Sequence, residues 1–385
     1  MRKQLRKMMT ASLALSLLLG PALTASAAVS PEFARSAEEW AALQDDVLNY
    51  SEIPDLIHEY NTTVINNNYS YQAFIRDYGR TRTDVSDQYT YLAEKLISNK
   101  TGEDGVGQVT DFQLDQQAEN LLKQADNTVE DSYVYYLQYQ SQEQNLVLQA
   151  KKLFINYYSG QYSLDSAKQR LELLRRQAEL ASLKAAGGMA TSADVLDAQE
   201  AVLSQEEAVS KQEQTIENTR KSLIVMCGWN SEALPQITEL PEPDLAAIDA
   251  VNYETDLAQA LENNYTLKIN QRKLENSANQ DNIDTYTNTI DGNKRSIGVS
   301  LSSAYQSLRS ARLSYDQAQN DLVTVQRNYD LASQKYAAGM ITALDYETAR
   351  VDLAVQQNTA KAAALTLLSA WETYQAEVAG SASAS

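Results

Sequence analysis

Cysteine and histidine are nearly absent from this chain, and their scarcity excludes whole classes of chemistry. The single cysteine, Cys227, cannot form an intramolecular disulfide, and its place at an apparent helix end predicts a small buried side chain. The single histidine, His58, has no cysteine or second histidine with which to build a metal site. A glycine-rich phosphate loop, a Gly-x-Ser-x-Gly elbow and a Cys-x-x-Cys pair are also missing. We therefore expect that the protein has no catalytic, cofactor-binding or metal-binding residues and that it is not an enzyme.

Basic residues are in short supply. The chain has 32 Lys and Arg against 51 Asp and Glu, which gives a net charge of −19. Proteins bind nucleic-acid backbones through clustered Lys and Arg, so this composition argues against a nucleic-acid partner.

The start of the chain has the features of an export signal. A basic beginning is followed by a short apolar run over residues 11–19 and by small residues at 25–28. This order predicts a signal peptide over residues 1–28, and the apolar run is too short to span a membrane as a helix. We expect an exported protein of the cell envelope, located in the outer membrane, the periplasm or at the cell surface.

Proline divides the sequence into two long blocks. None of the six prolines lies between Asp55 and Leu234, and none follows Pro243. Proline breaks helix interiors, and both blocks are rich in good helix formers, so they predict very long helices. From the positions of the prolines we expect four segments after the signal peptide. They are a first helical repeat at 29–234, a proline-containing linker at 235–254, a second helical repeat at 255–379 and a disordered tail at 380–385.

One short motif occurs twice, 151 positions apart. It reads Gly-Met-x-Thr-x-x-Asp, and in both places it follows a segment with helical periodicity. Glycine suits the left-handed residue that ends a helix, and Thr with Asp three positions later forms a capping box for the next helix. The aspartates could in addition form a cation-selecting ring. The predicted tip residues are Gly188, Met189, Thr191 and Asp194 in the first copy and Gly339, Met340, Thr342 and Asp345 in the second.

Apolar residues recur every seven positions after the first tip. The second seam position is mixed and includes Gln205 and Gln212. A narrow, partly polar seam predicts a helix packed among several neighbours, and a helix from about 131 to 186 would form a coiled-coil rod beside it. The fold expected is all-α, with long antiparallel helical hairpins in two tandem repeats and little or no β-strand. The regular seam positions are Val195, Val202, Val209, Ile216 and Leu223.

A weaker similarity links the beginnings of the two halves. Residues 55–61 resemble residues 256–264 at an offset of 201, so the first half carries about 50 additional residues before its hairpin. A loop is expected at 99–107 inside this insert, and a corresponding turn at 291–293 in the second half. Residues 297–301 alternate for about the length of one strand only.

Tyrosine is the dominant aromatic residue, with 23 Tyr against 4 Phe. Seven tyrosines between positions 133 and 162 lie on the long first-half helix. Tyrosine buries its ring while its hydroxyl stays hydrated. The cluster is interpreted as interhelical packing, with an oligomer surface or a groove for peptides or glycans as alternatives.

Two halves that each contain a long helix, a Gly-x-x-Thr-x-x-Asp turn and a second helix resemble the bacterial outer-membrane efflux factors, the TolC family. The resemblance covers about residues 50–378 and is strongest at 180–199 and 331–350. It implies a homotrimer whose helices enclose a tunnel, with the tip residues docking a periplasmic adaptor protein tied to an inner-membrane pump. No pair of segments alternates over the ~9–11 residues that a membrane strand needs, so we expect a reduced member that lacks the barrel strands.

The function expected from the resemblance is that of a passive conduit for efflux or secretion. The alternative is a non-transporting coiled-coil scaffold or binding protein of the cell envelope or the extracellular space.

Overall fold

The computed structural model describes residues 35–102 and 106–384, and the predicted signal peptide lies outside these residues. The chain divides into two compact units. Unit 1 contains the residues up to Leu56, Leu148–Ala250 and Gln306–Thr373, and unit 2 contains Ile57–Val147, Val251–Tyr305 and the residues from Tyr374 onward. In the described part, the only strands are β1 (Val47–Leu48) and β2 (Gln236–Ile237), which pair in parallel. The predicted all-α class is confirmed.

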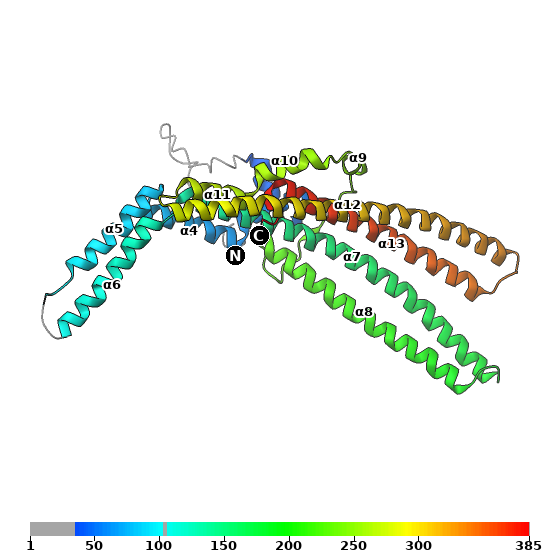
Figure 1. Cartoon of the computed structure of the whole chain (residues 1–385). Helices are drawn as coiled ribbons and strands as arrows, with labels where there is room; N and C mark the ends of the chain where they lie inside the picture. Colours follow the sequence, from blue (N-terminus) through cyan, green and yellow to red (C-terminus); the bar gives the residue numbers. More distant parts are fainter. Residues whose placement is uncertain (1–34, 103–105, 385) are drawn as a thin grey trace, which may run out of the picture. The chain divides into compact units, whose positions relative to one another are not determined.

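Unit 1 is built on two helical hairpins (Figure 1). The first joins α7 (Ser132–Ala186) to α8 (Ser192–Met226), and the second joins α12 (Gln280–Ala337) to α13 (Ala343–Ala376). The early residues of α7 and α12 belong to unit 2. Three short helices complete unit 1: α2 (Ala37–Gln44), η1 (Tyr50–Glu52) and α9 (Leu245–Asp249).

The apolar residues predicted to recur every seven positions form the buried stripe of α8. Its residues become less exposed away from the tip, from half-buried Val195 to fully buried Leu223. The polar seam position is satisfied across the hairpin, because the side-chain amide of Gln205 donates to the carbonyl oxygen of Ala167 at 3.0 Å.

The second hairpin repeats this bond at the same offset of 151, with the Gln356 amide donating to the carbonyl of Ala318 at 3.5 Å. The two hairpins therefore share this contact.

Unit 1 has a buried aromatic core where α7 contacts η1. Phe154 packs edge-on against Tyr50 with 5.4 Å between the ring centroids, and burial raises the pKa of the Tyr50 hydroxyl. The Tyr158 hydroxyl donates to the carbonyls of Ile237 and Thr238, and burial raises its pKa to about 12. These bonds hold the proline-rich segment against α7. Cys227 is buried at the end of α8, as expected.

Unit 2 contains the helices that open each half. They are α4 (Thr62–Tyr78), α10 (Tyr253–Asn263) and α11 (Tyr265–Glu275), together with η2 (Glu377–Ser381) at the C-terminal end. The second half of α3 (Ile53–Tyr60) also belongs to unit 2. Asn61 and Asn264 cap α4 and α11 by accepting from the backbone N–H of Thr63 and Leu267. These asparagines are 203 positions apart, so the two halves correspond at an offset two residues longer than the sequence similarity suggested.

The additional residues of the first half form a helical hairpin of their own. It consists of α5 (Arg82–Ser98) and α6 (Val106–Asn127), and it separates α4 from α7. In the second half, α11 leads to α12 through residues 276–279 alone. Residues 99–102 of the predicted loop follow α5 outside any helix.

The expected turn at 291–293 is wrong, because α12 runs through it without a break. Asn293 is buried, and its side chain bonds to the Asn270 side chain and to the Ala384 carbonyl instead of closing a turn. The short alternation at 297–301 is also helical: Ile297 and Leu301 are fully buried, one turn apart, while Val299 is exposed. Apolar residues spaced four apart, as on one face of a helix, were here mistaken for the two-residue alternation of a strand.

Residues 380–384, expected to belong to a disordered tail, make specific contacts within unit 2. The fully buried side-chain amide of Asn264 donates to the carbonyls of Gly380 (3.2 Å) and Ala382 (2.8 Å), and Ala382 and Ala384 are buried. Small Ser and Ala side chains predict flexibility from composition alone. Here their size lets the backbone lie against α10 and α12.

Candidate interaction site at the hairpin tips

The two predicted tip motifs adopt the same backbone conformation. Gly188 and Gly339 have φ values of 72° and 71°, the left-handed conformation expected of a helix-ending glycine. The following N–H closes the turn in each copy: Met189 N donates to the Lys184 carbonyl at 2.7 Å and Met340 N to the Lys335 carbonyl at 2.8 Å. Because the bonded pairs are again 151 residues apart, one turn design serves both tips.

A capping box starts the second helix of each hairpin. Thr191 Oγ1 accepts from Asp194 N at 3.2 Å, and Thr191 N donates to the Asp194 carboxylate at 2.7 Å. Thr342 and Asp345 make the same bonds at 3.2 and 3.0 Å. The structure thus brings all eight predicted residues into two equivalent turns, four to each.

The capping bonds determine the charge of the tips. The backbone N–H of Thr191 lowers the pKa of Asp194, and the Thr342 hydroxyl together with its N–H lowers the pKa of Asp345. A lowered folded-state pKa means that these caps contribute stability above the ordinary aspartate pKa of ~3.9 and lose it as the pH falls through the folded value.

We predict from this that the tips keep their charge and structure between neutral and mildly acidic pH. Amide hydrogen exchange at residues 187–195 and 338–346, corrected for the intrinsic pH dependence of exchange, should show unchanged protection from pH 7 to pH ~5. Tips that open within that interval would contradict the assignment.

Exposed methionines form the outer surface of both turns. Met189 and Met340 have 76% and 73% of their surface accessible. Leu183, six residues before Met189, and Leu196, seven residues after it, are also exposed, so the first tip carries apolar side chains at the surface of a strongly acidic protein. Exposed apolar residues grouped in this way are typical of protein contact sites.

The second tip is distinguished by a group of tyrosines. The rings of Tyr336 and Tyr346 stack with centroids 4.9 Å apart, and the hydroxyls of Tyr329 and Tyr346 share a hydrogen bond of 2.9 Å. The corresponding residues of the first hairpin are Ala185, Val195 and Ala178. The backbone of the two tips is therefore the same, but the surfaces differ, and a partner could distinguish them.

The glycine conformation leads to a direct prediction. Replacing Gly188 with Ala should cost about 1–2 kcal/mol, because a Cβ is unfavourable in the left-handed region, although no neighbouring atom would obstruct it. Gly187 in the same turn has no positive φ, and the one atom that a Cβ there would approach within 3.4 Å is the flexible end of Met189. Gly187→Ala is thus the matched control for chemical unfolding, and equal losses for the two variants would contradict this view of the turn.

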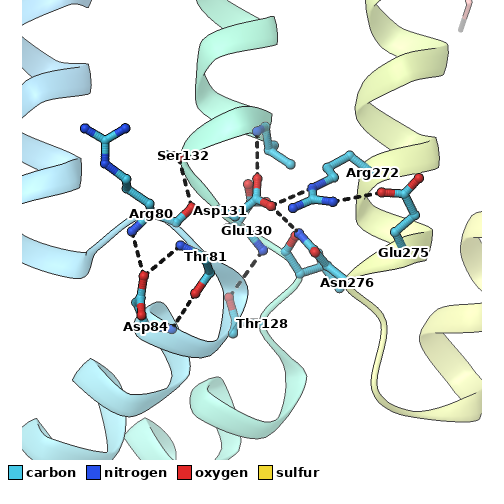
Figure 2. Close-up of polar contacts among 12 residues, drawn as sticks. Arg80, Thr81, Asp84, Thr128, Glu130, Asp131, Ser132, Arg272, Glu275 and Asn276 are labelled. Carbon is cyan, nitrogen blue, oxygen red and sulfur yellow. Dashed lines mark hydrogen bonds and ion pairs between the residues drawn. The ribbon is translucent and has the colours of Figure 1, made fainter.

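A second polar cluster was not predicted from the sequence. It lies in unit 2 where the α5/α6 hairpin leaves and rejoins the chain (Figure 2). We call it the root cluster, and its centre is Asp131, whose side chain is fully buried. One Asp131 oxygen caps α7 through Val134 N, and the other accepts from Arg272 Nε at 2.6 Å and Asn276 Nδ2 at 3.0 Å. The root cluster comprises Arg80, Thr81, Asp84, Asp131, Ser132, Arg272 and Asn276.

The same cluster fixes the start of the insert. Thr81 and Asp84 form a capping box for α5, and the Arg80 carbonyl accepts from both the N–H and the hydroxyl of Ser132 (Figure 2). Both oxygens of the buried Asp131 carboxylate accept hydrogen bonds from groups of this chain. The root cluster is therefore a structural joint and leaves the tips as the candidate interaction site.

The tyrosines on α7 pack as the interhelical interpretation expects. In unit 2, Tyr135 lies against Phe74 of α4 with 4.2 Å between centroids, and Tyr136 approaches Tyr71. His58 is paired with Glu143, Nδ1 to Oε1 at 2.8 Å. Across the described residues no group of His, Cys, Asp and Glu is arranged to hold a metal ion. None of the helices described is both long enough and apolar enough to cross a lipid bilayer.

Comparison with known proteins shows a relationship in structure only. No protein-family model and no curated protein matches the sequence. A membrane protein from Pseudomonas aeruginosa is 11% identical, with 86% of this chain and 90% of that chain covered and a TM-score of 0.52. CusC, described in terms of folding and transmembrane channel formation, is 11% identical, with 86% and 92% covered and a TM-score of 0.52. The fold is TolC-like.

A further solved structure shows a weaker similarity. The outer membrane channel CmeC of Campylobacter jejuni is 14% identical, with 96% of this chain and 95% of that chain covered and a TM-score of 0.49.

Proposed function

We propose that this protein is the conduit component of an export system of the cell envelope. Three copies would pack through their long hairpins around a passage, and the tips would dock a periplasmic adaptor tied to an inner-membrane pump. Transport through such a conduit is passive, since the protein shapes a path and needs no bond chemistry. The observation that carries the proposal is the doubled hairpin with exposed, capped Gly-Met tips on a TolC-like fold.

Exposed leucines along the hairpins support self-association. Leu196 and Leu203 lie seven residues apart on α8, with 64% and 66% of their surfaces exposed. On α12, Leu313 and Leu331 are separated by five full helical turns and are also exposed. Each pair occupies one face of its helix outside the buried seam. A copy of the same chain, which carries both stripes, is the partner expected to cover them.

We predict that the mature protein sediments at about three times its monomer mass and that L196E/L203E reduces it to monomer. Two carboxylates placed in an apolar interface would lose hydration without gaining a partner. The matched control is S204E/Q214E, which adds the same charge at exposed positions of α8.

The outcome of this measurement separates the conduit from a scaffold. A wild-type monomer at micromolar concentration, or a L196E/L203E variant that stays trimeric, would contradict self-association through these stripes. A deletion strain that exports normally would favour the non-transporting scaffold.

A further inference from the structure

Methionine is distributed unevenly along the chain. Of six methionines, three lie within the first nine residues, and the others are Met189, Met226 and Met340. Two of these three occupy equivalent positions in the two tips, 151 residues apart, and are about three-quarters exposed. The third, Met226, lies partly buried at the end of α8. The tips therefore carry the two most exposed methionines of the described chain.

Packing does not account for this exposure. In a helix end of this type, the residue after the left-handed glycine normally packs on the side chain four or five positions before that glycine. For Met189 the candidates are Lys184 and Leu183, which is itself well exposed. For Met340 they are Lys335 and Gln334, which offer no apolar side chain. The thioethers are thus presented to solvent on rigid turns.

We propose that Met189 and Met340 form a paired site of reversible sulfoxidation by peroxide. Hydrogen peroxide transfers one oxygen atom to the sulfur: the O–O bond breaks, an S–O bond forms, the sulfur is oxidised by two electrons and water leaves. A methionine sulfoxide reductase reverses the step, since its dithiol becomes a disulfide while the sulfoxide oxygen leaves as water.

The chemistry changes the tip surface and leaves the turn intact. Sulfoxidation replaces a flexible apolar group with a polar one. The bonds that hold each turn are backbone and Thr–Asp bonds and do not involve sulfur. Oxidation therefore removes apolar contact area from a folded tip and weakens its association with the adaptor. This regulatory consequence rests on the proposed docking of the tips, whereas the modification itself does not.

The modification is tested on the purified mature protein treated with hydrogen peroxide. Peptide mass spectrometry over time should show Met189 and Met340 converting at least ~5-fold faster than Met226, with recovery on addition of a methionine sulfoxide reductase and dithiothreitol. Circular dichroism should show unchanged helicity after oxidation. Oxidation of Met226 at the same rate, or loss of helicity as the tips oxidise, would overturn the assignment.

The regulation is tested in the producing cell with photoreactive benzoylphenylalanine in place of Ala190, beside Met189. Adducts formed on illumination should decrease several-fold after peroxide in the otherwise wild-type protein and in M226L. In M189L/M340L the adduct yield should be the same with and without peroxide. Equal peroxide sensitivity of M226L and M189L/M340L would contradict the regulation. Absence of adducts in every sample would contradict tip docking, and with it the regulation, while the peptide measurement still decides the modification.

Discussion

Asp131→Ala is expected to lower the free energy of unfolding of unit 2 by about 3 kcal/mol. The substitution removes the cap of α7 and the buried acceptor of Arg272 Nε and Asn276 Nδ2. Among the described residues, Arg272 then keeps only Glu275 as a partner, and Asn276 keeps only the Val129 carbonyl. Removing one member of a buried pair costs about 3–5 kcal/mol. The lower end applies because a third of the Arg272 side chain is exposed and its charge stays partly hydrated.

The matched control is Glu275→Gln. Glu275 also pairs with Arg272, at 2.8 Å, but it is mostly exposed, so its loss should cost no more than ~0.5 kcal/mol. Denaturant unfolding gives the two free energies, and hydrogen exchange should show lost protection around residues 80–84 and 131–135 in D131A only. Equal costs for the two variants would mean that Asp131 is not the centre of the root cluster.

Gly160→Leu is expected to destabilise the first hairpin by about 2–3 kcal/mol. A Cβ at position 160 would lie 2.8 Å from Cγ1 of Ile216, a buried seam residue of α8, and a leucine would add three more carbons in the same place. Gly160 is thus the point at which α7 and α8 approach closely, and the Gln212 side chain donates to its carbonyl there.

A double-mutant cycle tests the cause of this loss. Ile216→Ala removes the side chain in conflict, so the double variant G160L/I216A should be more stable than the sum of the two single losses predicts, by 1 kcal/mol or more. Additive losses would show that position 160 acts through something other than contact with Ile216. Gly292→Leu in α12 is a useful comparison, because no atom lies within 4 Å of a Cβ at that glycine.

Local signals in the sequence were sufficient for the parts of the structure that depend on neighbouring residues. The seam of α8 and both tip motifs follow from spacings of seven and three residues, and the structure reproduces them down to the capping bonds. The turn expected at 291–293 failed because an Asp-Gly-Asn run was read without the helical pattern on either side, where Ile290 and Ile297 are buried seven residues apart.

The root cluster could not be found in this way. Asp131 is one of 51 acidic residues, and its main partner, Arg272, is 141 residues away along the chain. The contacts of residues 380–384 could not be predicted for a related reason, because the buried amide of Asn264 that bonds to them lies more than 115 residues earlier. Long-range pairing of single polar groups has no periodic signature, whereas helix seams and caps have one.

The bond between Arg80 and Ser132 has a practical consequence. The α5/α6 hairpin begins and ends at neighbouring points of the chain. Changes in its length or sequence during evolution should therefore leave α4 and α7 undisturbed. For the same reason, the α5/α6 hairpin is a suitable place to insert another domain. A short linker in place of residues 82–127, or a fluorescent domain between them, would report on assembly while both Gly-Met turns keep their native sequence.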